Sequence, residues 1–430
     1  MTIQSYHDFI LFADDVALDE HGALESFAVR VFDSPAGQSE KEQIVHLPKR
    51  VFDDTVAFGH ALRLLRDGAW NQELDKQIEL GQALADLLMP EPDVRQLYYR
   101  SLDWVSEHDD LGLRVRLRLP RELSPFPWEY MHVQRVGGER TARGFLARHP
   151  GVSIVRHEAL PIPARWFAAG QRQRVLVVMA TPDGLDRLTY LPDEQRQIRS
   201  VLAGVQAVEA EYVPDLSEVF GTGQIPSARL GQMLSALETQ TDILHFSGHG
   251  AFAREPSAHF DILQGWGSIV LARENNQPLE VSADELVGFV GHRGIRLVVL
   301  GACETAATDP LHAWSGVAVS LLAGEIPAVV AMQFKVDDKL TALFMGQFYK
   351  ALAGGDPIDQ AVFQGRQRMR LQMLEEDSTA IDWVAPVLYL RTPGQQRVCV
   401  YLLIEQTGFP GLGGSENDTD VAWNPLQKTK

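Results

Sequence analysis

The chain has 430 residues, 39 basic (Lys and Arg) and 57 acidic (Asp and Glu) side chains, a formal net charge of −18, and only two cysteines, Cys303 and Cys399. This length predicts two or three domains, and two cysteines exclude a disulfide framework. The acidic balance argues against direct binding to nucleic acid or to an anionic membrane and suits a basic protein partner.

The first part of the chain, residues 1–165, is predicted to form a mixed α/β lobe. Its opening residues lack the basic region and cleavage site of a secretory signal, so we expect a cytoplasmic protein. Residues 25–34 and 113–119 have the composition of strands, and the apolar spacing over 75–89 predicts a helix that ends at Pro90.

The segment 113–119 alternates leucine or valine with arginine, which places Arg114, Arg116 and Arg118 on one side of a strand. Such a row could bind a ligand. The favoured interpretation is a solvated face whose arginines pair with some of the many carboxylates.

A linker with prolines and arginines over 161–174 leads into a second domain, predicted over 170–405, and residues 406–430 have the composition of a flexible tail. Strands and helices alternate in this second domain, which predicts a mostly parallel sheet with helices on both faces. The predicted strands are 175–181, 207–213, 242–250, 297–305, 328–332 and 385–390, with a hairpin around 269–273; the predicted helices are 192–203, 226–239, 283–290, 312–323, 338–353 and 358–374.

The most apolar window, residues 316–334, contains Glu325 and Pro327. We interpret it as a helix followed by a buried strand, because a charged residue and a proline argue against a membrane span.

Two predicted strands end in small residues that carry one reactive side chain each. His249 lies between Gly248 and Gly250, and Cys303 follows Gly301 and Ala302. Neighbouring parallel strands deliver their carboxyl ends to one edge of a sheet, where ligands bind. The sequence therefore predicts a cysteine nucleophile, Cys303, beside its acid and base, His249.

Backbone amides are expected to stabilise the oxyanion of a tetrahedral intermediate. The N–H groups of Gly250 and Cys303 both follow strand ends, where such groups can point toward a substrate. No metal and no organic cofactor is required by this chemistry, and we expect none.

The other candidate residues have structural interpretations. Cys399 lies in an apolar run and is predicted to be core. His245 could in principle share a metal with His249 and Cys303, but no HExxH or paired CxxC accompanies it, so a hydrogen-bonded core histidine is favoured. The chain also lacks a P-loop and a GxSxG motif.

Several motifs together resemble the CHAT-domain family, the caspase- and separase-related cysteine peptidases found mainly in bacteria. They are the PWE sequence at 127–129, HFSGHG at 245–250, GACETA at 301–306, FKVDD at 334–338, QFY at 347–349 and DWVAP at 382–386. The separation between His249 and Cys303 is also close to the spacing of about 50 residues in caspases. The resemblance implies a caspase-like fold, a catalytic dyad at His249 and Cys303, and an oxyanion donor at Gly250.

The resemblance also suggests where a substrate would bind. Phe334 stands where the family usually has tryptophan and is expected to line the substrate groove. Similarity to separases favours a basic residue at the cleaved position, which needs a carboxylate; Asp338 is the first candidate, with Asp337 and Asp309 behind it. Capping of the helix that starts near Lys339 is an equally good role for Asp337 and Asp338.

The activity implied is that of an endopeptidase acting on a specific protein partner, latent until a regulatory partner or signal releases it, in bacterial regulation or antiphage defence. The first lobe could then be a regulatory half that restrains the site. The alternatives left open are a non-catalytic interaction or scaffold module with a caspase fold, and chemistry on a non-protein acyl group by the same dyad.

Overall fold

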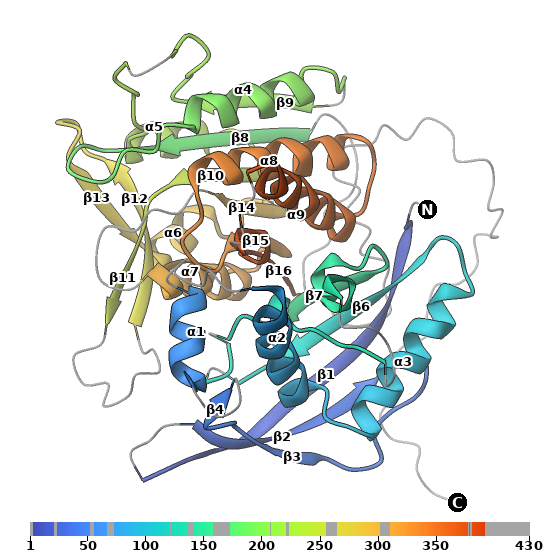
Figure 1. The fold of residues 1–430 in the computed structure, drawn as a ribbon. Coiled ribbons are helices and arrows are strands. Elements are labelled where there is room, and N and C mark those ends of the chain that lie inside the picture. Colours follow the sequence, from blue (N-terminus) through green and yellow to red (C-terminus); the bar gives the residue numbers. More distant parts are fainter. Residues whose placement is uncertain are drawn as a thin grey trace, which may run out of the picture.

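One large sheet organises the described part of the molecule (Figure 1). The computed structural model describes residues 3–20, 24–51, 56–66, 73–120, 122–124, 126–135, 141–157, 173–206, 208–220, 223–254, 265–301, 310–376, 378 and 381–391. Within these ranges, the 11-stranded sheet has the order β3 (Gln43–His46), β2 (Leu24–Asp33), β1 (Ser5–Leu18), β6 (Leu111–Arg118), β7 (Val152–His157), β16 (Pro386–Leu390), β15 (Ala328–Met332), β14 (Leu297–Gly301), β10 (Ile243–Gly248), β8 (Gln173–Ala180) and β9 (Val208–Val213).

The part of the sheet formed by the second half of the chain is mostly parallel. Strands β9, β8, β10, β14 and β15 pair in parallel, and β16 pairs with β15 in antiparallel orientation. Every residue of β8, β10, β14, β15 and β16 is buried, as expected of continuous apolar strands covered on both faces. The predicted mostly parallel sheet is confirmed.

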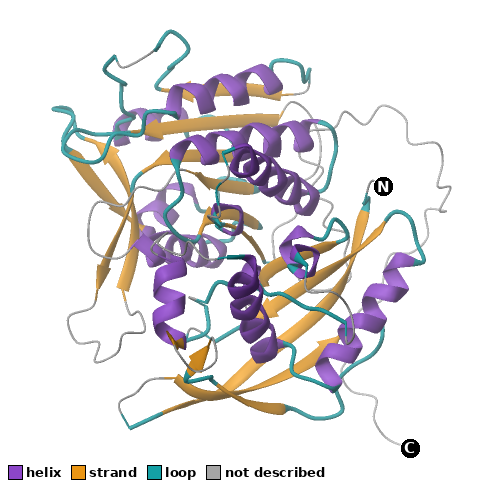
Figure 2. Cartoon of the chain, in the orientation of Figure 1, coloured by secondary structure: helices purple, strands orange, loops and turns teal. Residues whose placement is uncertain are grey.

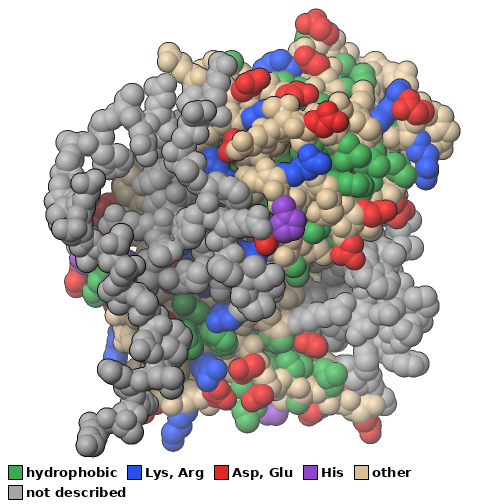
Figure 3. Space-filling model, turned by 180° about the vertical axis from the view of Figure 1, so that it is seen from behind, with side chains coloured by type: hydrophobic (Ala, Val, Ile, Leu, Met, Phe, Trp, Pro, Cys, Tyr) green, Lys and Arg blue, Asp and Glu red, His purple; other side chains and the backbone are tan. Residues whose placement is uncertain are grey.

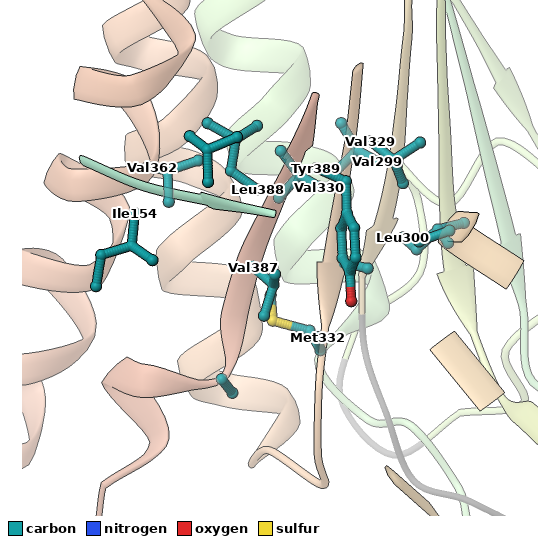
Figure 4. Close-up of a cluster of buried hydrophobic side chains, with 14 of the residues drawn as sticks. Ile154, Val299, Leu300, Val329, Val330, Met332, Val362, Val387, Leu388 and Tyr389 are labelled. Carbon is teal, nitrogen blue, oxygen red and sulfur yellow. The ribbon is translucent and has the colours of Figure 1, made fainter. Parts of the chain in front are cut away.

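The two halves of the chain share this sheet, because β7 pairs in parallel with β16, with Val155 opposite Leu388. The core continues across this junction, where Ile154, Leu388 and Val330 lie among buried side chains of neighbouring strands (Figure 4). Residues 158–172, where the boundary between the two predicted domains falls, lie outside the described residues. The domain boundary therefore stays a prediction.

Helices lie on both faces of the sheet (Figures 1 and 2). One group is α4 (Leu191–Leu202), α8 (Asp338–Ala353) and α9 (Ile358–Glu375), in which α8 contacts both of the others; a second group is α6 (Ala283–Val290) and α7 (Pro310–Ala323), which contact each other. The remaining helices are α1 (Phe58–Arg66), α2 (Leu74–Leu88), α3 (Asp93–Ser106) and α5 (Leu230–Ala236).

Most predicted elements are present within two residues, but one predicted helix is shorter, residues 302–305 of the predicted strand 297–305 lie outside the described residues, and several elements were not predicted. The helix predicted over 226–239 is shorter, because Arg229 is extended (φ −103°, ψ 152°) and forms a bridge with Ala272 before α5 begins. Strands β1, β3 and β7 and helices α1 and α3 were among the elements not predicted. Buried and partly exposed residues alternate in the middle of β1, and the ring of Tyr98 on α3 packs edge-on against Phe9 on β1 at 5.9 Å.

The hairpin predicted around 269–273 is a three-stranded antiparallel sheet of β11 (Gly250–Arg254), β12 (Gly265–Ala272) and β13 (Pro278–Ser282). It leaves the main sheet immediately after His249, so the chain changes direction at that residue. A short pair, β4 (Arg50–Val51) and β5 (Val56–Ala57), lies apart from both sheets.

The arginine row of β6 is buried rather than solvated. Arg114 and Arg116 are 9% and 2% exposed, and they form ion pairs with Asp359 and Asp8. Arg118 lies over the ring of Phe12, 4.1 Å from its centroid. The predicted pairing with carboxylates is confirmed and the predicted exposure is wrong, because helix α9 supplies the carboxylate of Asp359 to this face of the strand.

The surface of the described residues carries charges of both signs. On the face seen in Figure 3, basic and acidic side chains are interspersed, in keeping with a chain that has many of both and an excess of carboxylates. Single pairs such as Lys339 with Glu376 (2.6 Å) and Arg199 with Asp215 (2.7 Å) are examples of exposed ion pairs. Exposed pairs of this kind contribute little to stability.

Candidate active site

The candidate site lies where β10 and β14 end. These strands pair in parallel and in register up to Ser247 opposite Gly301. His249 is two residues beyond Ser247, and Cys303 is two residues beyond Gly301. Cys303 and Asp309 fall in the segment 302–309, which lies outside the described residues.

His249 occupies the junction between the main sheet and the small sheet. Its side chain is fully buried, and its carbonyl oxygen accepts a hydrogen bond from the N–H of Val270 on β12 at 2.9 Å. The preceding residue has to be glycine, because a Cβ on Gly248 would lie 2.8 Å from the carbonyl oxygen of Ala180 on β8. The close approach of β8 thus fixes the backbone from which His249 projects.

The backbone N–H of Gly250 points away from the small sheet. Gly250 is opposite Ile269, and the flanking bond runs from Val270 N–H to the His249 carbonyl. This is the pattern of a non-hydrogen-bonded pair, in which the N–H of the paired residue points away from the neighbouring strand. The N–H of Gly250 therefore takes no part in the hydrogen bonds between β11 and β12.

His245 belongs to a buried polar network beneath this strand end. Its Nε2 lies 2.8 Å from Glu194 Oε1 on α4 and 2.9 Å from Ser247 Oγ, and its Nδ1 lies 3.1 Å from the Tyr349 hydroxyl on α8. The Ser247 hydroxyl donates to the same Glu194 oxygen at 2.5 Å. The favoured interpretation of His245 as a hydrogen-bonded core histidine is confirmed, and both ring nitrogens are already engaged by protein groups.

Sequence reasoning assigned no role to Glu194, Ser247 or Tyr349, although Ser247 and Tyr349 lie in the HFSGHG and QFY motifs. The alternation H-x-S does indicate that His245 and Ser247 share a face of the strand. Their partners come from two distant helices, whose sequences carry no signal of this contact. Burial and the nearby charge of Glu194 raise the pKa of Tyr349 well above its ordinary value, so its hydroxyl stays protonated.

Asp337 caps helix α8, which is the role that the sequence offered as an alternative to substrate binding. Its Oδ1 accepts from the N–H of Lys339 at 2.8 Å and of Leu340 at 3.4 Å. Asp338 is half-buried, and its Oδ2 accepts from the N–H of Tyr190 at 3.1 Å, in the loop between β8 and α4. This loop leaves the carboxyl end of β8, so Asp338 lies at the same edge of the sheet as Gly248.

Phe334 is only 2% exposed and packs in the hydrophobic core immediately after β15. Nearby, Asp382 accepts from the N–H of Asp337 at 3.4 Å. Burial and the neighbouring charge of Asp337 raise the pKa of Asp382, although two backbone hydrogen bonds lower it. The roles of Phe334, Asp337 and Asp338 in substrate binding stay predictions.

The PWE sequence has a structural role at the junction of the two halves. Glu129 is fully buried and accepts from Arg156 Nη2 at 2.7 Å and from Gln333 Nε2 at 2.9 Å. Arg366 is also buried, and its burial lowers its pKa to about 10. The nearby negative charge of Glu129 acts in the opposite direction and raises the pKa of Arg366. Glu129 therefore neutralises cations contributed by β7 and α9.

One carboxylate cluster outside the candidate site has the composition of a metal site. Asp14, Asp15 and Glu42 have oxygens within 4.8 Å of one another. Arg30 pairs with Glu42 at 2.7 Å and with Asp14 at 3.8 Å, so a cation of the protein already contacts two of the three carboxylates. Among the described helices, none has the length and apolar composition needed to cross a bilayer.

Comparison with known proteins places the chain in a family. The model of the CHAT domain matches residues 79–391. A search of curated proteins found no match. Among solved structures, Saccharomyces cerevisiae separase in complex with securin is similar at 14% identity and a TM-score of 0.33, over 74% of this chain and 20% of that chain. The Arg-specific cysteine proteinase gingipain R is similar at 10% identity and a TM-score of 0.39, over 67% of this chain and 65% of that chain. The CHAT match spans more than half of the sequence, and the chain therefore belongs to the CHAT-domain family.

Proposed function

We propose that this protein is a cysteine endopeptidase with Cys303 as nucleophile and His249 as acid and base. The observation that carries the proposal is the register of β10 and β14, in which Ser247 is opposite Gly301. Adjacent strands are about 4.8 Å apart, and in the sequence each reactive residue follows its member of this pair by two residues. That arrangement, together with membership of the CHAT family, favours an imidazole next to a thiol.

In this proposal the thiolate of Cys303 attacks the carbonyl carbon of the scissile peptide. The oxyanion that forms accepts hydrogen bonds from the N–H groups of Gly250 and Cys303; the outward direction of the Gly250 amide supports this role. Protonated His249 then gives its proton to the departing amine, which leaves a thioester on Cys303. His249 next removes a proton from water, which attacks the thioester, releases the acid product and regenerates the thiol.

The substrate proposed is a protein cleaved after a basic residue. The net charge of −18 and the half-buried carboxylate of Asp338 at the same edge of the sheet favour a basic group there. We further propose that the enzyme is latent until a partner or signal acts on it, in bacterial regulation or antiphage defence. The full burial of His249 supports latency, because an imidazole without exposed surface has to be uncovered before it meets a protein substrate.

The first test is the rate at which iodoacetamide alkylates each cysteine as a function of pH, followed by mass spectrometry. An assembled dyad predicts that Cys303 reacts well below the ordinary cysteine pKa of about 8.5 and that His249→Ala removes this reactivity. Cys399 serves as the internal control. Equal, slow reaction of both cysteines in the purified protein is the result expected either of a site locked until an activator binds or of the non-catalytic interaction module, and the second test separates these two.

The second test separates a peptidase from a scaffold in cells. A phage-plating assay compares bacteria carrying the wild-type protein, Cys303→Ala and His249→Ala. A peptidase predicts that both substitutions abolish any protection, whereas a scaffold keeps it. Loss of the cleaved partner from the wild-type proteome, but not from the Cys303→Ala proteome, identifies the substrate.

A further inference from the structure

We propose that Glu194, His245, Ser247 and Tyr349 form a positioning network that aligns the ends of β10 and β14 for catalysis. This inference rests on the proposed function, because the residues that it aligns are His249 and Cys303. None of the four side chains is expected to touch the substrate. They act through the backbone of the two strands.

The network is closed and completely buried. The exposed fraction is 1% for Glu194 and 0% for His245, Ser247 and Tyr349. One pattern of protons satisfies all four groups: Tyr349 donates to His245 Nδ1, His245 Nε2–H donates to Glu194, and Ser247 donates to Glu194. Burying a carboxylate and an imidazole is costly unless they are hydrogen-bonded in this way.

The same residue types occur in serine hydrolases, but the connections here differ. In a catalytic triad the acid binds one ring nitrogen and the serine binds the other. Here Glu194 and Ser247 both meet Nε2 of His245, while Nδ1 faces Tyr349. Because Ser247 also has no exposed surface, the network is not a second hydrolytic centre.

The network reaches both strand ends. His245 and Ser247 lie on β10, which continues into His249 two residues later. On the neighbouring strand, a Cβ placed on Gly301 would lie 2.7 Å from Ser247 Oγ and 3.5 Å from Glu194 Oε1. The polar groups therefore pack directly against the last residue of β14, two positions before Cys303.

The network also ties these strand ends to the covering helices. Glu194 lies in the first turn of α4, and Tyr349 lies in α8, which contacts α4. A displacement of either helix changes the hydrogen bonds of β10 at the residue next to the site. This provides a physical route by which a partner that binds over α4 and α8 could act on His249.

The experiment compares Tyr349→Phe, Ser247→Ala and Glu194→Gln with the wild-type protein. Tyr349→Phe is the mildest change, since it deletes one hydroxyl and keeps the ring that packs edge-on against Phe348 at 5.4 Å. A matched control is Gln195→Met. Gln195 is equally buried on α4, but it bonds to the carbonyl of Pro214 at 2.9 Å and the N–H of Leu216 at 2.6 Å, away from β10.

Positioning predicts that each network variant lowers the alkylation rate of Cys303 at pH 7 by about 10-fold or more, since small displacements of reacting groups have large kinetic effects. With a cleavable peptide, kcat falls and KM changes less than about 2-fold. Gln195→Met loses thermal stability and keeps the wild-type alkylation rate.

Folded Tyr349→Phe and Ser247→Ala proteins with wild-type alkylation rates and kcat would overturn the positioning role and leave the proposed function intact. If Cys303 is as unreactive as Cys399 in the wild-type protein and the Cys303→Ala variant also keeps its function in the cell assay, the dyad itself is overturned, and with it this inference. A fall in alkylation that Gln195→Met reproduces at equal stability would show that the effect is one of general destabilisation and would overturn the specific role of the network.

Discussion

Arg114 and Asp359 form a bidentate ion pair between the first lobe of the chain and a helix of the second half. Arg114 Nε donates to Oδ1 of Asp359 at 2.9 Å, and Nη2 donates to Oδ2 at 2.6 Å. Burial alone would raise the pKa of Asp359, but the charge and hydrogen bonds of Arg114 outweigh it and hold that pKa below its ordinary value. The carboxylate of Asp359 is therefore charged at neutral pH, and its ion pair with Arg114 connects α9 to β6.

Asp359→Asn is expected to lower the free energy of unfolding by about 3 kcal/mol at pH 7, since it removes the bidentate partner of a buried arginine and leaves Arg114 with only the longer pair to Asp8 at 3.5 Å. The stabilisation from Asp359 is fully present above the unfolded pKa of about 3.9 and is lost as the pH falls through the lower folded pKa. The difference between wild type and variant should thus shrink below about pH 4. Urea unfolding at pH 7, 5, 4 and 3 measures it, with the exposed Asp284→Asn as control. A constant difference would contradict the depressed pKa.

Glu129→Ala should be among the most destabilising single changes, at about 3–5 kcal/mol, because Arg156 and Arg366 then share a buried site without a carboxylate. Chemical denaturation of the wild type and the variant measures the difference. The matched control is Glu211→Gln, whose half-exposed carboxylate pairs with Arg174; less than about 1 kcal/mol is expected there. Equal losses for both variants would show that Glu129 is not needed as a buried counter-charge.

Gly81→Ala is expected to destabilise the protein by about 1–3 kcal/mol through overpacking. A Cβ at this position of α2 would lie 2.7 Å from the carbonyl oxygen of Tyr130 and 2.8 Å from the Cβ of His132, so the backbone after the PWE sequence has to move. Gly288→Ala on α6 has no atom within 4 Å of the new Cβ and should be neutral or stabilising. Thermal unfolding of the two variants distinguishes these outcomes, and a stable Gly81→Ala protein would refute the close packing of α2.

Asp337 and Asp338 are neighbours with separable effects. Asp337→Ala should lower the free energy of unfolding by about 1 kcal/mol by removing the cap of α8, and Asp337→Ser should restore most of it. Asp338→Ala is expected to raise KM for peptides with a basic residue at the cleaved position while stability changes less. The assay compares peptides that differ only at that residue. Unchanged KM with Asp338→Ala would remove this residue from the specificity pocket.

The sequence by itself determined the parallel part of the fold and the positions of the proposed dyad. Strands such as 175–181 and 328–332 are continuous apolar runs, and this composition requires burial on both faces. The glycines around His249 and the small residues before Cys303 mark the ends of two predicted strands, and β10 and β14 are present there. These signals are local in the chain, which is why pattern and composition were enough to find them.

Only the tertiary structure decided which polar side chains are buried and what they contact. Arg114 and Arg116 look like a solvated row until α9 places Asp359 against Arg114 and β1 places Asp8 against Arg116. His245 likewise has no visible partner until α4 and α8 bring Glu194 and Tyr349 to it. The register of Ser247 with Gly301 likewise depends on how two strands separated by a small sheet and a helix come to pair. A buried charge or hydrogen bond needs a partner that is distant in sequence, and a local pattern of residues does not specify which distant segment supplies it.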